Sequence, residues 1–188
     1  MKPARSENNG FRIVRPAENL LEEFLEFCRE TWGKVHDSYI LKDPEQYEQW
    51  RPTLLREYRE AEQGIHLPPG FTRSVTFWIL KGNRMIAIAN LRPELTEQLR
   101  NYGGHLGLAI RPSERRKGYG KTITLLLAEK AKALGIRELL LTCEAANTAS
   151  VRLSKSLPGT RNEYDEAMVN GKQCKILRTW LKLIAESE

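Results

Sequence analysis

A basic, glycine-containing loop between a strand and a helix constrains this chain more than any other segment. The loop reads Arg115-Arg116-Lys117-Gly118-Tyr119-Gly120-Lys121-Thr122. It follows an apolar run at 106–110 that is typical of a buried strand, and an amphipathic helix is predicted to begin near Tyr119. Glycine lets the main chain approach an anion closely, and the first N–H groups of a helix are unpaired donors at the positive end of its dipole. The segment therefore predicts a phosphate-binding site.

The spacing within the loop excludes an ATP-binding P-loop, although Gly120-Lys121-Thr122 matches the end of that motif. A P-loop would require glycine at position 115, where this chain has arginine. The spacing present is Arg115-x-x-Gly118-x-Gly120. It resembles the pyrophosphate loop of the GCN5-related N-acetyltransferases (GNAT), in which a Gln/Arg-x-x-Gly-x-Gly/Ala motif binds acetyl-CoA.

The order of the neighbouring segments agrees with this resemblance. A helical pattern after the loop ends at Gly135, a second apolar strand follows at 138–143, and Asn147-x-x-Ser150 resembles the Asn-x-x-Ala/Ser signature of the family. Residues 75–183 match the family best. Within the superfamily, the chain looks most like a bacterial branch whose members are known only as predicted acetyltransferases.

We predict one domain over residues 1–188, with residues 1–10 as a disordered tail. Two hairpins are expected, one at 75–91 and one around Asn170-Gly171, where both turn positions need positive φ. The predicted fold class is therefore α/β: a GNAT-like mixed, mostly antiparallel sheet with a central parallel β-α-β unit and flanking helices.

The helices before residue 75 carry their own start signals. Asn19 and Glu22 have the spacing of a capping box, and Asp43-Pro44 predicts the start of a second helix. Pro52 interrupts the apolar pattern of that helix, so we expect a kink or a division into two helices near Arg51. The segment 93–103 permits a short helix or a covering loop.

Charge and cysteine content limit the classes of partner. With 30 basic and 24 acidic residues the net charge is +6, which suits a polyanion, but no run of five basic residues occurs. A local cluster has the size of the phosphates of one CoA; it comprises Arg111, Arg115, Arg116, Lys117 and Lys121. We therefore expect no nucleic-acid partner, although a nucleic-acid-binding module is kept as an alternative.

Cys28, Cys143 and Cys174 have neither disulfide nor metal-ligand spacing, so we expect reduced, buried thiols and no metal. No apolar run approaches the ~20 residues of a membrane span, and the first residues are polar. A cytoplasmic protein without a membrane role is expected, and a homodimer is an additional possibility.

The resemblance implies roles for particular groups. Backbone N–H groups of 108–110 would polarise the acetyl carbonyl, those of 117–122 would hold the pyrophosphate, and Asn147 and Ser150 would contact the pantetheine arm. The implied cofactor-binding residues are Leu108, Ala109, Ile110, Arg115, Arg116, Lys117, Gly118, Tyr119, Gly120, Lys121, Thr122, Asn147 and Ser150. Asn147 could also serve as a helix N-cap.

The implied activity is transfer of acetyl from acetyl-CoA to an amine of a small molecule or peptide, by direct attack in a ternary complex. Many family members have a tyrosine that acts as the general acid seven residues after the asparagine, where this chain has Ser154. Tyr164 or solvent would then protonate the thiolate. His105 and Glu144 are the candidate bases, with strand hydrogen bonding and helix capping as their structural alternatives.

The amine that would accept the acetyl group is the part of the predicted activity that the sequence defines least. Aromatic and acidic side chains before residue 60 would suit a cationic amine, but they would equally fill a helix-packing core. They are Trp32, His36, Asp37, Tyr39, Tyr47, Trp50 and Tyr58. A non-catalytic CoA-binding protein of the same fold is the further alternative.

Overall fold

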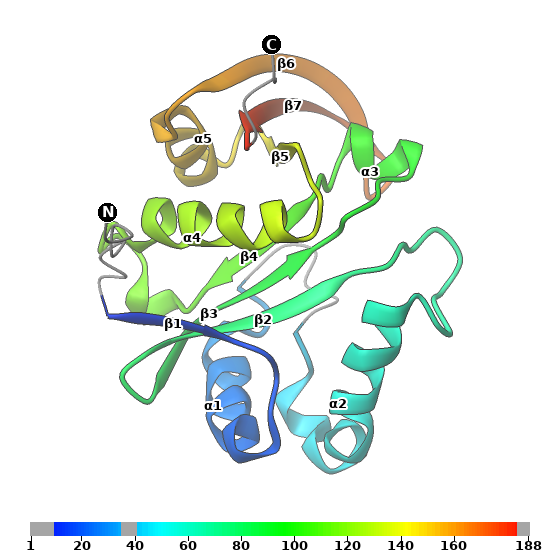
Figure 1. Cartoon of the computed structure of the whole chain (residues 1–188), viewed down its shortest axis with the longest axis vertical. Coiled ribbons are helices and arrows are strands. Elements are labelled where there is room, and N and C mark those ends of the chain that lie inside the picture. The colour runs from blue at the N-terminus through cyan, green and yellow to red at the C-terminus, as the bar shows by residue number, and fades with distance from the viewer. Residues whose placement is uncertain (1–9, 35–40, 184–188) are drawn as a thin grey trace, which may run out of the picture.

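The computed structural model describes residues 10–34 and 41–183, which form two antiparallel sheets with helices around them (Figure 1). The first sheet has the order β1-β2-β3-β4, with β1 Phe11–Val14, β2 Val75–Lys81, β3 Arg84–Leu91 and β4 Leu106–Ile110. The second has the order β5-β7-β6, with β5 Glu138–Glu144, β6 Thr160–Val169 and β7 Lys172–Lys182.

Five α-helices and three 3₁₀ turns are formed by the described residues. The helices are α1 Leu21–Thr31, α2 Tyr47–Gln63, α3 Glu97–Asn101, α4 Tyr119–Ala133 and α5 Thr148–Ser156. The turns are η1 Glu18–Leu20, η2 Pro44–Gln46 and η3 Pro112–Glu114. Helices α1 and α2 lie on one side of the first sheet and α4 lies on the other, while α5 packs beside the second sheet (Figure 1). None of these helices is long and apolar enough to span a membrane.

Strand β2 shows why the first sheet is covered on both faces. Phe77 and Ile79 belong to the core on the α4 side, whereas Trp78 and Leu80 belong to the core on the side of α1 and α2. Because both faces are buried, the strand reads as a continuous apolar run. Trp78 stacks on Phe24 of α1 with ring centroids 4.8 Å apart, which fixes α1 against the sheet.

The predicted α/β class, the two hairpins and the strand-loop-helix order around residue 119 are confirmed. Lys81 pairs with Arg84 around a two-residue turn, and Asn170 and Gly171 have φ of 49° and 77°. Gly135, with φ of 83°, ends α4 as its left-handed C′ residue. The segment 93–103 forms a short helix, α3, whose N-cap Thr96 accepts a hydrogen bond from Leu99 N.

The central β4-α4-β5 unit joins the two sheets instead of lying within one. At the start of β4, His105 N donates to Leu140 O at 2.8 Å, and Gly103 N donates to Thr142 Oγ1 at 2.8 Å. A β-carbon on Gly104 would lie 2.4 Å from Leu140 O, so only glycine permits this approach. Beyond this seam no strand ladder joins β4 to β5 among the described residues. The two strands therefore separate toward the loop at 115–122.

One prediction about a helix start differs from the structure. Asn19 lies within η1, and α1 begins after Leu20, which makes no side-chain cap, so the predicted capping box is wrong. The 3₁₀ turn displaces the N-cap by one residue, from Asn19 to Leu20, and Glu22 instead accepts a hydrogen bond from Tyr47 OH. By contrast, Asp43 does cap the second helical segment, accepting from Glu45 N at 3.0 Å.

Helix α2 runs through Pro52 as one helix, so of the two alternatives, a kink or a division near Arg51, the division does not occur. Pro52 and Glu48, whose carbonyl loses its partner, are both exposed. Water can therefore hydrogen-bond that carbonyl and reduce the cost of the proline. The three thiols are free, with Cys28 and Cys143 buried and Cys174 half-buried. The predicted tail residues 1–9 lie outside the described residues.

Candidate functional site

The backbone of the loop has the conformation of an anion cradle. Arg116 and Gly118 both have positive φ, 64° and 79°. Alternation between left-handed and right-handed residues turns successive N–H groups toward one point. Helix α4 begins at the next residue, and its N-cap Gly118 supplies no capping side chain. The first N–H groups of α4 are therefore available for an anion, as a pyrophosphate site requires.

The second glycine of the motif has a packing role. A β-carbon on Gly120 would lie 3.3 Å from Leu153 Cδ2 and 3.6 Å from Ile110 Cδ1. Gly120 thus lets the first turn of α4 approach both α5 and the end of β4. This contact places Asn147 and Ser150, at the start of α5, on the same side of the molecule as the loop.

Four basic side chains of the predicted phosphate cluster are exposed around the loop, at 115, 116, 117 and 121. Arg115 Nε donates to Ile110 O at 3.0 Å, and Lys117 Nζ lies 2.9 Å from Glu114 Oε2. These contacts hold two of the cations close to the cradle. Their long-range charge complements a polyphosphate.

Arg111 does not belong to this cluster, so its inclusion among the phosphate-facing residues is wrong. Its side chain is 3% exposed and forms ion pairs with Glu23 at 3.1 Å and Glu30 at 3.5 Å. Its guanidinium also lies over the ring of Phe27. Arg111 therefore anchors the end of β4 to helix α1, because two carboxylates of α1 hold it there.

Glu30 connects α1 to the turn that precedes the loop. Its carboxylate accepts a hydrogen bond from Ser113 N at 2.6 Å and lies 3.5 Å from Arg84. Although burial opposes ionisation, these bonds and the charges of Arg111 and Arg84 hold the pKa of Glu30 below its usual value. No local sequence pattern predicts this contact, since the two segments are 83 residues apart.

The edge of β4 that faces away from β3 borders the gap between the sheets. Residues 106–110 pair with β3 on one side only, and no ladder covers the other edge among the described residues. Leu108 and Ile110 are half-buried, and Ala109 is buried. Because Arg111 N bonds to Ile86 O, the alternating register directs the backbone groups of Ala109 to β3 and those of Leu108 and Ile110 into the gap. An acetyl-binding role for the backbone N–H groups therefore stays a prediction for Leu108 and Ile110 and does not fit Ala109.

Asn147 is the N-cap of α5, and its Oδ1 accepts from Ser150 N at 3.1 Å. Its capping role is therefore confirmed, while contact with a pantetheine arm stays a prediction for both residues. Ser154, at the position of the family tyrosine, is buried.

Glu144 lies at the end of β5, half-buried, and its backbone O accepts from Asn147 N at 2.9 Å. It is paired with Ile176 of β7, which is paired in turn with Asp165 of β6. Directly opposite residues of neighbouring strands share a face, so Glu144 and Asp165 point the same way. Tyr164 precedes Asp165 and points to the other face.

Tyr164 is not brought to the gap between β4 and β5. It lies on the edge strand β6, separated from β5 by β7, and is 45% exposed. Its ring is flanked by the ammonium groups of Lys155, at 5.3 Å, and Lys175, at 5.1 Å. Two strand spacings correspond to roughly 10 Å between Tyr164 and β5.

His105 is engaged in the seam between the sheets. Its Nδ1 accepts a hydrogen bond from Leu140 N at 2.9 Å. Burial, with smaller contributions from the charges of Arg100 and Arg92, lowers the pKa of His105 to about 4. The imidazole is therefore neutral near pH 7, and its unprotonated nitrogen already has a donor.

The predicted acceptor-side aromatics divide into core and surface. Trp50 is buried with Phe24 and Trp78, and Tyr47 and Tyr58 pack against the same core. Trp32 is 42% exposed. His36, Asp37 and Tyr39 lie outside the described residues.

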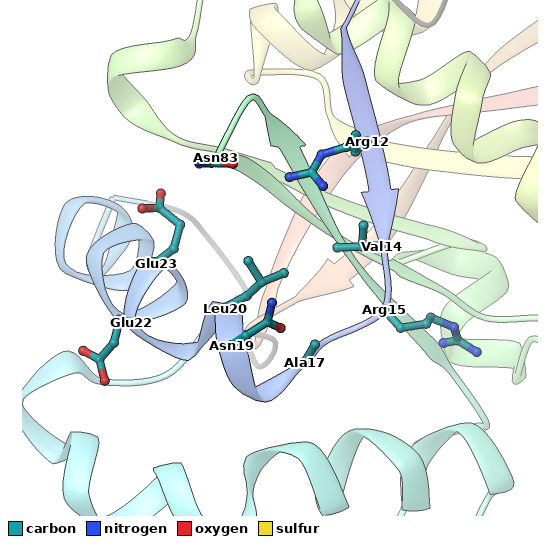
Figure 2. A pocket seen from close by; sticks show the side chains of 9 residues that line it. All are labelled: Arg12, Val14, Arg15, Ala17, Asn19, Leu20, Glu22, Glu23 and Asn83. Carbon is teal, nitrogen blue, oxygen red and sulfur yellow. The ribbon is translucent and has the colours of Figure 1, made fainter.

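A separate hollow of about 650 Å³ lies between β1 and the start of α1 (Figure 2). Figure 2 shows Arg12 and Asn83 on one side of it and Glu22 and Glu23 on α1. These charged groups already have partners within the protein. Arg12 donates to Gly82 O, and Glu23 accepts from Met85 N.

A sheet that separates at β4 and β5, with a basic glycine loop leading from β4 into a helix, defines the class of GNAT-fold proteins. The chain belongs to the acetyltransferase (GNAT) family, whose sequence model matches residues 18–157. The resemblance predicted from the loop is therefore confirmed. A search of curated proteins found no match to this sequence.

Solved structures of low sequence identity share the fold. A GNAT acetyltransferase from Streptococcus pneumoniae is 17% identical with a TM-score of 0.59, over 92% of this chain and 98% of that one. The yncA protein from Salmonella typhimurium, solved with its cofactor acetyl-CoA, is 15% identical with a TM-score of 0.59, over 96% and 98%. The spermidine N-acetyltransferase from Vibrio cholerae, in complex with CoA and spermine, is 12% identical with a TM-score of 0.58, over 93% and 96%.

Proposed function

We propose that this protein transfers an acetyl group from acetyl-CoA to an amine of a small molecule or peptide, by direct attack within a ternary complex. The observation that supports this most is the anion cradle at Arg116 and Gly118, set at the start of α4 beside the uncovered edge of β4. Similar proteins that were solved with acetyl-CoA or CoA add support.

The chain offers groups for each part of the cofactor. Backbone N–H groups of residues 116–122 would hold the pyrophosphate, with the side chains of Arg115, Arg116, Lys117 and Lys121 adding charge. Asn147 and Ser150 would border the pantetheine arm, and the backbone N–H groups of Leu108 and Ile110, which face away from β3, would polarise the acetyl carbonyl. Acetyl-CoA supplies the acetyl group as a thioester.

We infer that Glu144 is the base that accepts the proton of the ammonium substrate. It ends β5 beside the gap and points to the face of the sheet opposite Tyr164. His105 is less suited, because accepting a proton at Nδ1 would cost the hydrogen bond from Leu140 N. For the thiolate, solvent protonation fits better than Tyr164, since β7 separates Tyr164 from the gap.

Release of free thiol from acetyl-CoA across a panel of amines tests the proposal, with mass spectrometry to identify the acetylated product. The panel should contain polyamines, amino acids, aminoglycosides and peptide N-termini. Thiol release that depends on one class of amine is the expected result. Tight binding of acetyl-CoA without turnover on any amine would instead indicate a non-catalytic CoA-binding protein.

A further inference from the structure

A hollow of about 420 Å³ lies beside the cradle, on the side of α4 that faces β1. It is lined by Phe11, Lys81, Lys117, Gly118, Tyr119 and Thr122. Four of these residues come from the predicted pyrophosphate loop. Phe11 and Lys81 come from strands β1 and β2, far away in the sequence, and no acidic residue lines the hollow.

Aromatic groups hold the Lys81 ammonium in this hollow. Its Nζ donates to Tyr119 OH at 2.8 Å and lies 4.6 Å from the centroid of the Tyr119 ring. It also lies 5.7 Å from the ring of Phe11, which packs edge-on against Tyr119 with centroids 5.1 Å apart. Within residues 10–34 and 41–183, no carboxylate forms an ion pair with Lys81. Its charge is thus positioned but not neutralised.

The two flanks of the cradle differ. On the flank toward α5, Leu153 packs against Gly120 and fills the space. On the flank toward β1, the hollow presents Lys81 and Lys117. A phosphodiester bound in the cradle, with its pantetheine arm toward β5, would extend its other end toward the open flank.

We propose that Lys81, together with Lys117, binds the 3′-phosphate at the adenosine end of CoA and so sets a preference for CoA over 3′-dephospho-CoA. This assignment rests on the proposed function, because it takes the pyrophosphate to occupy the cradle. A phosphate monoester carries close to two negative charges at neutral pH. Lys81 offers it an unneutralised ammonium, and Lys117, which is paired with Glu114, offers a second donor.

Titration calorimetry with CoA and with 3′-dephospho-CoA tests the assignment on the full-length protein. The wild type is expected to bind CoA more tightly by on the order of tenfold. Lys81→Gln should remove most of this preference while leaving the affinity for 3′-dephospho-CoA within about twofold, because glutamine stays polar but carries no charge. The preference of the wild type should also decrease as salt is raised.

Lys172→Gln is the matched control. Lys172 is also an exposed lysine that flanks a two-residue hairpin turn. It lies in β7, far from Lys81 along the chain. It should retain the wild-type preference. Equal affinity of the wild type for the two ligands would overturn the assignment, as would an equal loss for both ligands in Lys81→Gln.

The two proposals fail in different ways. If neither CoA nor 3′-dephospho-CoA binds the folded protein, both the proposed function and this assignment are wrong. If both ligands bind with one affinity, only the role of Lys81 is wrong. Adenosine 3′,5′-bisphosphate provides an independent probe: its affinity should decrease in Lys81→Gln and remain unchanged in Lys172→Gln, and an unchanged affinity in both would contradict the assignment.

Discussion

Glu144 and Tyr164 lie on opposite faces of the β5-β7-β6 sheet. Glu144 is opposite Ile176, Ile176 is opposite Asp165, and Tyr164 is the strand neighbour of Asp165. Side chains alternate between faces along a strand, so these two candidates cannot contact the same reacting group from one side. The structure therefore places the candidate base, Glu144, and the candidate acid, Tyr164, on opposite faces of this sheet.

Glu144→Gln is expected to lower turnover by about 10²- to 10⁴-fold, the usual range for loss of a general base. Acetyl-CoA affinity should remain unchanged, because Glu144 does not belong to the cradle. Initial rates of thiol release and calorimetry measure the two effects. Glu138→Gln, an exposed change at the start of the same strand, is the control and should behave as the wild type. Full turnover in Glu144→Gln would exclude it as the base.

Tyr164→Phe should leave turnover within about twofold of the wild type. The backbone of Tyr164 lies roughly two strand spacings from that of β5, so a direct proton transfer to a thiolate in the gap is not expected. Thiol release at saturating acetyl-CoA is the measurement. A decrease of about a hundredfold without a change in acetyl-CoA affinity would show that Tyr164 reaches the site after all.

His105 should make folding stability depend on pH. Its pKa is lowered from 6.5 to about 4 in the folded state, so between these values the unfolded chain binds a proton that the folded chain does not. The stabilisation by neutral His105 is thus fully present above about pH 6.5 and is lost as the pH decreases toward 4. Because the imidazole is only half-buried, we expect a loss of about 1 to 2 kcal/mol between pH 7.5 and pH 5.

Urea unfolding of the wild type and His105→Gln at both pH values isolates this contribution. Glutamine can still accept from Leu140 N but does not titrate. The wild type should lose more free energy of unfolding than the variant between the two pH values. Identical losses in the two proteins would show that His105 is not held neutral by the fold.

Gly104 and Gly82 form a matched pair for the seam between the sheets. Both have φ close to 61°, but a β-carbon at 104 would lie 2.4 Å from Leu140 O, whereas at 82 it would meet nothing within 4 Å. Gly82→Ala should cost about 1 kcal/mol from backbone strain alone. Gly104→Ala should cost ~2 kcal/mol more, because the backbone of β5 must move. Equal midpoints of thermal unfolding would argue against a close approach at the seam.

Local signals predicted most of the secondary structure. Asn170-Gly171 specified a hairpin through its two positive φ values, and Gly135 specified the end of α4, because each requirement lies within a few residues. The capping box at Asn19 failed for the opposite reason. Its helix start is displaced by a 3₁₀ turn, and Glu22 finds a partner in Tyr47, 25 residues away.

Long-range contacts explain what the sequence did not reveal about the site. Arg111 is a basic residue close to the loop in sequence, as the loop cations are. In the structure, however, two carboxylates of α1 bind its guanidinium and hold it away from the phosphate cluster. Gly120 has an ordinary φ, so its packing against Leu153 could not be distinguished from anion binding by pattern alone. The partnership of Lys81 with Tyr119 spans 38 residues and depends on the sheet order.

The most direct test of the account is acetyl-CoA binding by the wild type, Gly118→Asn and Gly118→Asp, measured by calorimetry. Position 118 has φ of 79° and no neighbour within 4 Å, so asparagine and aspartate, which tolerate this conformation, should both fold there. The two variants differ only in one negative charge at the centre of the cradle. We expect acetyl-CoA but not ATP to bind the wild type, and Gly118→Asp to bind acetyl-CoA at least about tenfold more weakly than Gly118→Asn. Equal affinities of the two variants, or binding of ATP alone, would contradict a pyrophosphate site at this loop.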